Sequence, residues 1–325
     1  MPPILSVQNL KVSIRDHETG RSGWVLRGID FEIESGERVA LVGESGCGKT
    51  VMALTLMNLL PSPPMDWVDG SVLFKGRELK ELGPLEWREI RGAQLSMIFQ
   101  EPLNSLNPVF TVGDQVTEIL LVHQEINKEK ARERVLTLFR EVGLTDPPRV
   151  YGQFPHELSG GMCQRIMIAM AVACGPSLLI ADEPTTALDV TVQAQILDML
   201  FAMTQEKALG LLLITHNLPL LRDYAHRILI LYAGQVVEAG AAADIFTRPR
   251  HPYTEGLLGA LPDPSQKGKA LANISGQVPS IYERTEGCGF APRCPKAQSR
   301  CGREEPSWSE EKKGHGFRCF YPSET

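Results

Sequence analysis

The most constraining feature of this chain is a glycine-rich segment that joins an apolar stretch to a helix-forming one. Residues 43–50 read Gly-Glu-Ser-Gly-Cys-Gly-Lys-Thr and fit the pattern G-x-x-x-x-G-K-[ST]. Residues 37–42 predict a short apolar strand before it, and residues 49–60 predict a helix that ends before Pro61. The order strand, glycine loop, helix is the context in which this pattern binds phosphate, and it predicts an α/β fold.

This loop has the chemistry of a nucleotide-phosphate site. Its glycines let backbone N–H groups turn inward around a phosphate, and the N-terminus of the following helix adds partial positive charge. Lys49 can reach the β- and γ-phosphates, and the Thr50 hydroxyl can ligate Mg²⁺. A glycine loop that fits the pattern by chance is disfavoured by its position between a strand and a helix. We expect the nucleotide to contact Gly43, Glu44, Ser45, Gly46, Cys47, Gly48, Lys49 and Thr50.

The remainder of residues 1–250 has the pattern of an α/β domain. Two continuously apolar runs predict strands buried on both faces of a mostly parallel sheet, and residues 227–238 predict a hairpin that turns at Ala233-Gly234. Residues 102–175 are largely helical in pattern and predict a helical insertion. The two apolar runs are residues 177–181 and 211–215, and the insertion includes helices over residues 128–142 and 162–174.

Composition excludes several classes of protein. With 43% hydrophobic and 22% charged residues the sequence is globular, and a net charge of −6 argues against a dedicated nucleic-acid binder. The start of the chain does not have the pattern of a signal peptide. The longest uncharged stretch, residues 166–181, has 16 residues, whereas a membrane-spanning helix needs roughly 20. We expect a cytosolic chain, in which stable disulfides are unfavourable.

Two carboxylates accompany the loop. Residues 178–181 are apolar and lead into Asp182 and Glu183, at the carboxyl end of a predicted strand. Asp182 would hold Mg²⁺, directly or through water, and Glu183 would act as general base on the attacking water. Taken alone, a strand followed by an acidic helix cap explains these residues equally well. Together with the phosphate loop, they favour the hydrolytic interpretation.

These motifs, in this order, resemble those of the ATP-binding-cassette (ABC) ATPases over residues 4–250. Residues 158–162, Leu-Ser-Gly-Gly-Met, match the family signature L-S-G-G-x. The serine of this segment lies 23 residues before Asp182. The resemblance implies that Ser159, Gly160 and Gly161 cap the γ-phosphate of an ATP bound to the opposite subunit. A serine and two glycines before a helix also suit an anion. The implied fold is a P-loop NTPase core of the RecA-like type with a helical subdomain.

Three further positions match the same family. The resemblance implies that Gln100, after a predicted strand over residues 95–99, senses Mg²⁺ and couples to a membrane domain. It places residues 187–189 at the dimer seam and implies that His216 touches the γ-phosphate and orients Glu183. The implied catalytic residues are Lys49, Glu183 and His216, and the implied Mg²⁺ ligands are Thr50, Gln100 and Asp182.

The adenine contact is less sharply defined by the resemblance. An aromatic residue upstream of the phosphate loop usually stacks on the adenine ring in this family. Trp24 and Ile14 are the two alternatives here, because residues 15–23 have the pattern of an inserted loop.

Residues 251–325 differ in composition from the rest. They hold 17 glycines and prolines and four of the seven cysteines, and they predict a small appended module with little core of its own. The four cysteines are spaced C-x5-C-x6-C-x17-C, without the C-x2-C pair typical of structural zinc. This spacing leaves a [4Fe–4S] cluster, a zinc ion and free thiols open. The four are Cys288, Cys294, Cys301 and Cys319.

The C-terminal segment also narrows the resemblance. Residues 250–254 (Arg-His-Pro-Tyr-Thr) and 292–295 (Pro-Arg-Cys-Pro), with residues 99–108 and 184–191 upstream, resemble the ATP-binding subunits of dipeptide/oligopeptide permeases. Members with these four cysteines can bind a [4Fe–4S] cluster, so the resemblance implies a cluster on the four cysteines, with Zn²⁺ as the alternative. A structural role is favoured over electron transfer because a small Gly/Pro-rich module needs a staple.

The resemblance implies a function and a set of partners. The chain would hydrolyse ATP to ADP and phosphate as the motor of a dipeptide/oligopeptide importer, peripheral on the cytoplasmic face of the inner membrane. It would act with two transmembrane permease subunits, a second and related ATPase subunit in a heterodimer rather than a homodimer, and an extracytoplasmic peptide-binding protein.

Three alternatives to this function are weighed. One is an importer of nickel or another small solute in the same subfamily. Another is a soluble ABC ATPase of DNA repair or translation, which the single phosphate loop and the lack of sustained heptads disfavour. A structural iron–sulfur protein with an inactive cassette is disfavoured because Lys49, Asp182, Glu183 and His216 are all present.

Overall fold

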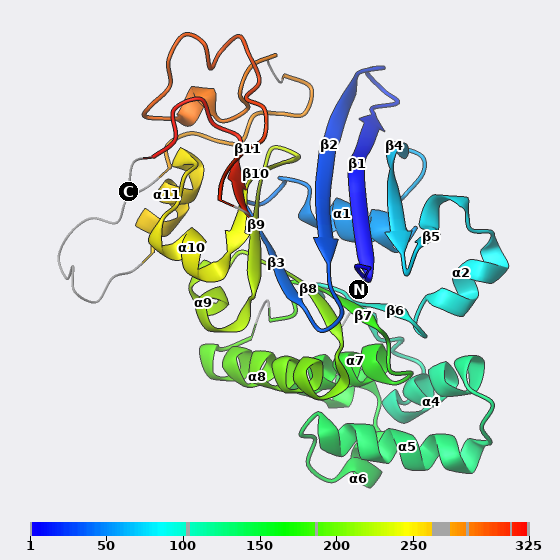
Figure 1. Cartoon of the computed structure of the whole chain (residues 1–325). Helices are drawn as coiled ribbons and strands as arrows, with labels where there is room; N and C mark the ends of the chain where they lie inside the picture. Colours follow the sequence, from blue (N-terminus) through cyan, green and yellow to red (C-terminus); the bar gives the residue numbers. More distant parts are fainter. Residues whose placement is uncertain are drawn as a thin grey trace. The chain divides into compact units, whose positions relative to one another are not determined.

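The computed structural model (Figure 1) describes residues 2–101, 105–185, 188–261, 274–283, 286–312 and 314–323. Contacts within the chain divide it into two units, each assembled from separate segments. Unit 1 holds residues 1–4, 33–37 and 80–214, and unit 2 holds residues 5–32, 38–79 and 215–325. The predicted cassette of residues 1–250 and extension of residues 251–325 follow a different boundary, and that division stays a prediction.

Three parallel strands form the buried centre of unit 1. They are β6 (Leu95–Ile98), β7 (Leu178–Asp182) and β8 (Gly210–Thr215), paired in the order β6-β7-β8. Every residue in them is buried, as expected for strands covered on both faces. The apolar runs therefore gave the correct strands, within one residue at each end.

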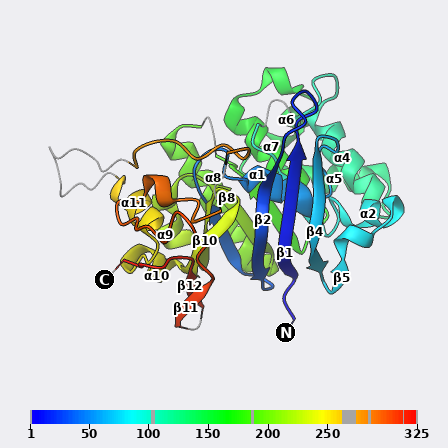
Figure 2. The same cartoon turned by 90° about the horizontal axis from the view of Figure 1, so that it is seen from above.

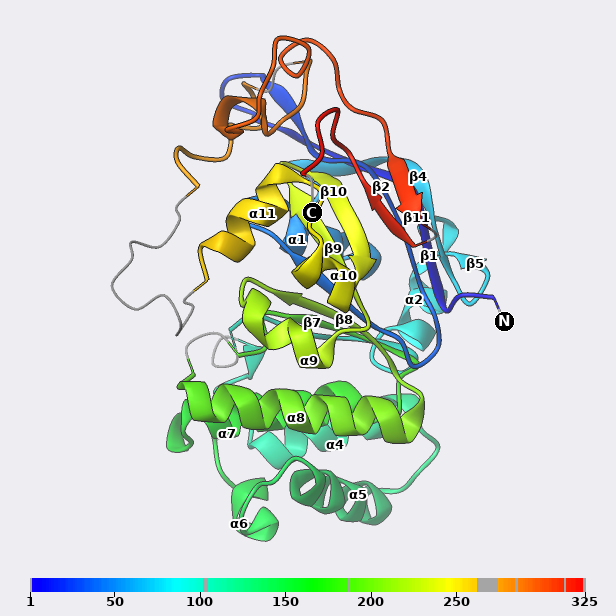
Figure 3. The same cartoon turned by 60° about the vertical axis from the view of Figure 1, so that its left-hand side comes forward.

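Several helices of unit 1 begin after side chains that cap them. Thr111, Asn127, Ser159 and Asp189 each accept a hydrogen bond from a backbone N–H of the first turn. In Figure 3 α7 and α8 lie side by side, and Arg165 of α7 donates to Gln195 of α8. The predicted helices over residues 128–142 and 162–174 are confirmed as α5 and α7, while residues 102–104 of the predicted insertion lie outside the described residues. The helices are α2 (Pro84–Ile90), α4 (Val112–His123), α5 (Lys128–Glu141), α6 (Pro147–Tyr151), α7 (Gly160–Val172) and α8 (Val190–Lys207).

Unit 2 contains an antiparallel sheet in the order β2-β1-β4-β5. Figure 2 shows β2, β1 and β4 next to one another. The connection between β1 and β2 spans residues 16–21, where the sequence predicts an inserted loop. Along β1 buried and exposed residues partly alternate, which is the pattern of a sheet with one covered face. The strands are β1 (Leu5–Arg15), β2 (Ser22–Ile33), β4 (Met65–Phe74) and β5 (Arg77–Glu78).

A second group of strands in unit 2 combines a strand from the N-terminal part of the chain with strands from its C-terminal part. Strands β3 and β9 are parallel, β9 and β10 form the predicted hairpin, and β12 pairs with β10. Ala233 and Gly234 at the hairpin turn both have positive φ, 46° and 81°, as a two-residue turn of this kind requires. The strands are β3 (Arg38–Val42), β9 (Arg227–Tyr232), β10 (Gln235–Ala241), β11 (Ser309–Lys312) and β12 (His315–Phe317).

The C-terminal segment contributes a strand that pairs within unit 2. Its strand β12 hydrogen-bonds to β10, with Glu238 opposite Phe317. The composition of residues 251–325 did not indicate this pairing, because strand pairing depends on distant residues.

One predicted helix is shorter than expected. Helix α1 spans Lys49–Leu56 instead of continuing to residue 60. Asn58 adopts the left-handed conformation with φ 49°, and the Leu59 N–H donates to the Leu54 carbonyl. A left-handed residue with this hydrogen bond ends a helix before any proline is reached.

The other helices of unit 2 are short. None of the helices in the described part of the chain is long and apolar enough to cross a bilayer. They are α9 (Leu221–Tyr224), α10 (Ala242–Thr247) and α11 (Pro252–Gly259).

Candidate functional site

The glycines of the phosphate loop are fixed by close backbone approach and by conformation. The loop connects β3 to α1, as predicted, and a Cβ atom at Gly43 would lie 2.2 Å from the Leu231 carbonyl oxygen. Gly48, which precedes α1, has φ 110°, a conformation that side-chain-bearing residues rarely adopt. Ser45 and Gly46 at the tip are exposed. The loop therefore keeps its backbone N–H groups close to a surface that an anion can reach.

Lys49 lies across this loop. Its side chain is buried, with 6% of the residue exposed, and its ammonium donates to the carbonyl oxygens of Gly43 at 2.8 Å and Glu44 at 3.1 Å. The exposed Thr50 follows it at the start of α1. Cys47 of the loop is buried, and burial raises the pKa of its thiol. A cation and an exposed hydroxyl thus stand at the N-terminus of one helix, which suits a phosphate and its counter-ion.

A set of contacts that the sequence did not reveal holds Glu44 of the loop. The Glu44 N–H donates to the Tyr253 hydroxyl at 3.0 Å, and Arg293 donates to both carboxylate oxygens of Glu44 at 2.8 and 3.1 Å. Tyr253 and Arg293 lie in segments noted above for their resemblance to a family, but nothing in their spacing indicated the phosphate loop. Both contacts join residues more than 200 positions apart.

The acidic residues of unit 1 lie at the end of β7. Asp182 is its last residue and is 1% exposed, and Glu183 follows. Glu183 has φ 46°, in the left-handed region, and its N–H donates to the Ile214 carbonyl at 2.9 Å. A non-glycine residue held in this region costs roughly 1–3 kcal/mol, and such residues cluster at functional sites.

Gln100 and Glu183 are brought together. The Gln100 side-chain amide donates to a Glu183 carboxylate oxygen at 3.2 Å. The sequence assigned these residues to one reaction, and the structure places them within hydrogen-bond distance although they are 83 positions apart. Thr186 and Ala187 lie outside the described residues. Ala187 is the first residue of the segment predicted to lie at the dimer seam.

The signature segment caps a helix with an open N-terminus. Ser159 is exposed, precedes α7 and accepts a hydrogen bond from the Met162 N–H at 3.4 Å. A Cβ atom at Gly160 would have no atom within 4 Å, and one at Gly161 would only touch Val192 at 3.4 Å. The helix is 13 residues long, so its dipole places a partial positive charge at the N-terminus.

His216, Trp24 and Ile14 belong to unit 2, as the phosphate loop does. His216 follows β8 directly and is exposed. Trp24 lies on β2 and is 43% exposed, whereas Ile14 is half-buried on β1 opposite Met65. The exposure of Trp24 suits stacking on a ring better than the paired position of Ile14 does.

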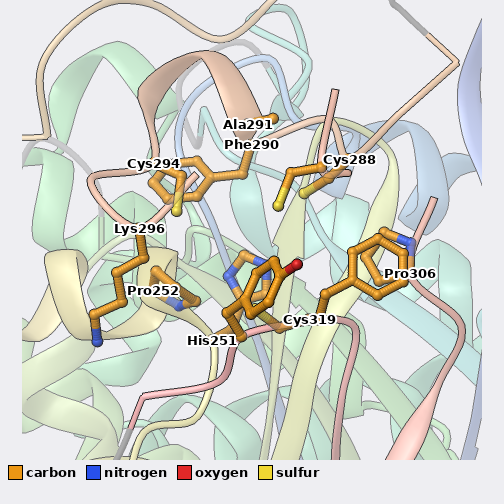
Figure 4. A pocket seen from close by; sticks show the side chains of 12 residues that line it. His251, Pro252, Cys288, Phe290, Ala291, Cys294, Lys296, Pro306 and Cys319 are labelled. Carbon is orange, nitrogen blue, oxygen red and sulfur yellow. The ribbon is translucent and has the colours of Figure 1, made fainter. Parts of the chain in front are cut away.

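The four C-terminal cysteines line one pocket (Figure 4). His251, Pro252 and Phe290 also line this pocket. All seven cysteines of the chain are free thiols. The side chains are not gathered as closely as a single ion requires, since no three His, Cys, Asp or Glu residues in the described segments form a group that could hold a metal ion. The pocket lining includes Cys288, Cys294, Cys301 and Cys319.

Burial raises the pKa of three of these thiols. Hydrogen bonds from the N–H groups of Phe290 and Ala291 lower the pKa of Cys288, and an N–H group of Tyr321 acts in the same direction on Cys319. Burial is the larger effect and raises the pKa of both thiols, that of Cys319 to about 11. Cys294 is affected in the same two ways. Buried thiols with N–H donors directed at sulfur are the surroundings in which thiolate ligands of clusters are found.

A buried carboxylate supports this pocket from below. Glu238 is fully buried and accepts hydrogen bonds from the N–H groups of Arg250 and His251 at 2.7 and 2.8 Å. His315, also buried, lies 2.9 Å from the same carboxylate. Burial lowers the pKa of His251 to about 4, so its ring is neutral near pH 7.

Comparison with known families gives two matches. A family model described as "ABC transporter" matches residues 26–186, and one described as "Oligopeptide/dipeptide transporter, C-terminal region" matches residues 237–301. The first covers the phosphate loop, Gln100, the signature and Glu183. The second covers Tyr253, Arg293 and three of the four C-terminal cysteines.

Individual proteins match over almost the whole chain. The dipeptide transport ATP-binding protein DppD of Escherichia coli (strain K12) is 47% identical over 319 residues, which cover 98% of this chain and 97% of DppD. The oligopeptide transport ATP-binding protein AppD of Bacillus subtilis (strain 168) is 45% identical over 321 residues, 98% of this chain and 97% of AppD.

Among solved structures, the dimeric ATP-binding cassette MJ0796 bound to ADP and phosphate has a TM-score of 0.66 at 26% identity. It aligns with 73% of this chain and 98% of the cassette.

Proposed function

This chain belongs to the family of ABC transporter ATP-binding subunits that serve dipeptide and oligopeptide import, and we propose how its residues bind and hydrolyse ATP. It is the ATP-hydrolysing motor of a peptide importer and part of a transporter complex with permease subunits. The hydrolysis converts ATP and water to ADP and phosphate.

The phosphate loop binds the triphosphate of ATP. The N–H groups of residues 43–48 and the start of α1 face the phosphate oxygens, and Lys49 leaves the carbonyl oxygens of Gly43 and Glu44 to contact the β- and γ-phosphates. Trp24, which is exposed, stacks on adenine. The single observation that carries this assignment is Lys49, a buried ammonium held at 2.8 Å by the loop's own backbone.

The hydrolytic step assigns one role to each polar residue. Thr50, Gln100 and Asp182 would supply the oxygen ligands that Mg²⁺ prefers, and the bound ion would neutralise phosphate charge. Glu183 takes the proton of the attacking water, and Gln100, which donates to its carboxylate at 3.2 Å, keeps that carboxylate in position. His216 contacts the γ-phosphate. Catalysis is then mostly positioning and charge neutralisation.

A second cassette completes the site. The exposed, glycine-flanked N-terminus of α7 is suited to a γ-phosphate held by a partner subunit, with Ser159, Gly160 and Gly161 nearest to it. We propose a heterodimer with a related ATPase subunit, bound to two permease subunits at the cytoplasmic face of the membrane and supplied by an extracytoplasmic peptide-binding protein.

The function is tested in proteoliposomes that contain the full transporter complex. Labelled dipeptide should accumulate inside only when ATP and Mg²⁺ are present on the side of this chain. Hydrolysis of ATP without any peptide movement, for every dipeptide and oligopeptide tried, would contradict the transport assignment.

We further propose that the cysteine pocket holds a [4Fe–4S] cluster. Four soft sulfur ligands that line one apolar pocket suit iron–sulfur or zinc ligation better than a hard ion. The bound group would staple a segment that has little core of its own. Iron and acid-labile sulfide in equal amounts after anaerobic purification support the cluster, and zinc without sulfide supports the alternative.

A further inference from the structure

Arg293 connects the cysteine pocket to the phosphate loop. It ends the short 3-10 turn Ala291–Arg293, and the next residue is Cys294 of the pocket. Its side chain is only 5% exposed, and it contacts Glu44, which belongs to the loop that binds ATP phosphates. One residue thus joins two sites that the proposed function treats separately.

Every N–H of the Arg293 guanidinium donates a hydrogen bond. Its Nε donates to the Ser275 carbonyl at 3.0 Å, and its two terminal nitrogens donate to Glu44, to the Tyr232 hydroxyl at 3.3 Å and to the Ile274 carbonyl at 3.2 Å. Arginine has five N–H donors, and these contacts employ all of them. Such a set fixes the position of the guanidinium far more closely than an exposed ion pair does.

The charge of Glu44 explains why the loop needs this contact. The Glu44 carboxylate belongs to a segment whose purpose is to bind a polyanion, and its own carbonyl oxygen holds Lys49 at 3.1 Å. Without a cation beside it, that carboxylate would repel ATP phosphates. Arg293 supplies the opposite charge in a two-point contact at 2.8 and 3.1 Å.

An aromatic cluster provides a second mechanical link. The Phe290 ring lies 5.2 Å from Tyr232 and 5.3 Å from Tyr253, and the Tyr253 hydroxyl accepts the Glu44 N–H. Phe290 is itself a wall of the cysteine pocket. Displacement of the turn that carries Phe290 and Arg293 therefore acts on both the side chain and the backbone of Glu44.

We propose that Arg293 is a positioning residue for ATP binding, which neutralises and holds Glu44 and makes the affinity of the phosphate loop depend on the integrity of the cysteine pocket. This inference rests on the proposed function, since it takes residues 43–50 as the ATP site. If the wild-type chain binds no ATP, the proposed function fails. If it binds ATP and Arg293 makes no difference, only this inference fails.

The first experiment measures the Kd for a fluorescent ATP analogue with the purified full-length chain. Arg293→Ala should weaken binding about tenfold, the factor that a coupling of about 1.4 kcal/mol gives. Arg293→Lys, which keeps the charge but loses the two-point contact, should recover part of this loss. Arg303→Ala is the matched control, because Arg303 is exposed in the same segment and donates to Ser299. Equal affinity of wild type and Arg293→Ala would overturn the proposal.

A second-site variant separates charge from folding. If repulsion by an uncompensated carboxylate causes the loss, Glu44→Gln in the Arg293→Ala chain should restore most of the affinity. Thermal unfolding of each variant, measured in parallel, identifies any chain that is simply unfolded. A double variant that folds but stays as weak as Arg293→Ala would refute the charge argument.

The third experiment tests the link to the pocket. Cys319→Ala removes a pocket thiol that is far from the loop in sequence and should weaken ATP binding severalfold. In the Arg293→Ala chain the same change should have no further effect, because the connection is already lost. Independent, additive losses would show that the pocket does not act through Arg293.

Discussion

Two neighbouring parts of unit 2 are built in different ways. The phosphate-loop segment, residues 38–56, is a buried strand, a glycine turn and a helix, and local sequence specifies each of them. The C-terminal segment from residue 286 has short strands and turns, and its main contacts are polar and long-range. The first segment is rigid because its backbone leaves no space, as at Gly43, whereas the second is held by side chains that pair with distant partners.

This difference suggests a division of labour. The loop supplies a fixed phosphate cradle, and the C-terminal segment adds a cation beside it and a thiol pocket. Damage to the loop should therefore abolish function at once, while damage to the C-terminal segment should act first on stability and affinity.

The largest effect is expected for Lys49→Ala. The variant removes the only ammonium that the loop's carbonyls hold at 2.8 and 3.1 Å in the described structure. Saturable ATP binding should disappear while thermal unfolding stays close to that of the wild type. Equilibrium dialysis with labelled ATP measures this, and retained affinity would break the assignment of the loop.

Glu183→Gln should reduce ATP turnover about 10²–10⁴-fold, the usual contribution of a general base. The amide keeps the shape of the side chain, so ATP binding should persist and the dimer of cassettes should remain closed. Steady-state ATPase assays of the complex, with size-exclusion chromatography in ATP, test both points. Normal turnover would remove Glu183 from its catalytic role.

Glu238→Ala tests the C-terminal segment in the same unit. Removing the buried carboxylate leaves His315 and the N–H groups of Arg250 and His251 without their acceptor. We expect a loss of about 3–5 kcal/mol in the free energy of unfolding. Urea unfolding measures it, and Glu304→Ala, which breaks an exposed ion pair with Arg300, serves as the control with little effect.

The smallest effect concerns pH. The pKa of His251 is lowered from 6.5 to about 4, so between these values the unfolded chain binds a proton that the folded chain does not. Stability from this group is complete above pH 6.5 and falls as the pH decreases toward 4, by about 2 kcal/mol at pH 5. In His251→Asn the side-chain oxygen can still accept the Tyr253 N–H. The free energy of unfolding of this variant, measured by urea unfolding, should fall less steeply between pH 7 and pH 5 than that of the wild type. An unchanged slope would contradict the assignment.

Local patterns placed several of the candidate residues at a strand end or a helix start. Asp182 and Glu183 follow an apolar run and Lys49 follows glycines, so strand and helix patterns gave their places in the chain, whereas Ser159 was singled out by the family resemblance and its role stays a proposal. The predicted end of α1 was wrong, because the left-handed conformation of Asn58 has no strong sequence signal. The pairing of β12 with β10 was also missed.

The amino-acid sequence by itself determined the buried strands, the phosphate loop and the family, because these depend on residues a few positions apart. Only the tertiary structure placed Arg293 and Tyr253 on Glu44, buried Glu238 beside His315 and brought four cysteines to one pocket. These contacts join residues separated by tens to hundreds of positions. Their energies come from charge pairing and desolvation in the folded chain, which no local pattern encodes.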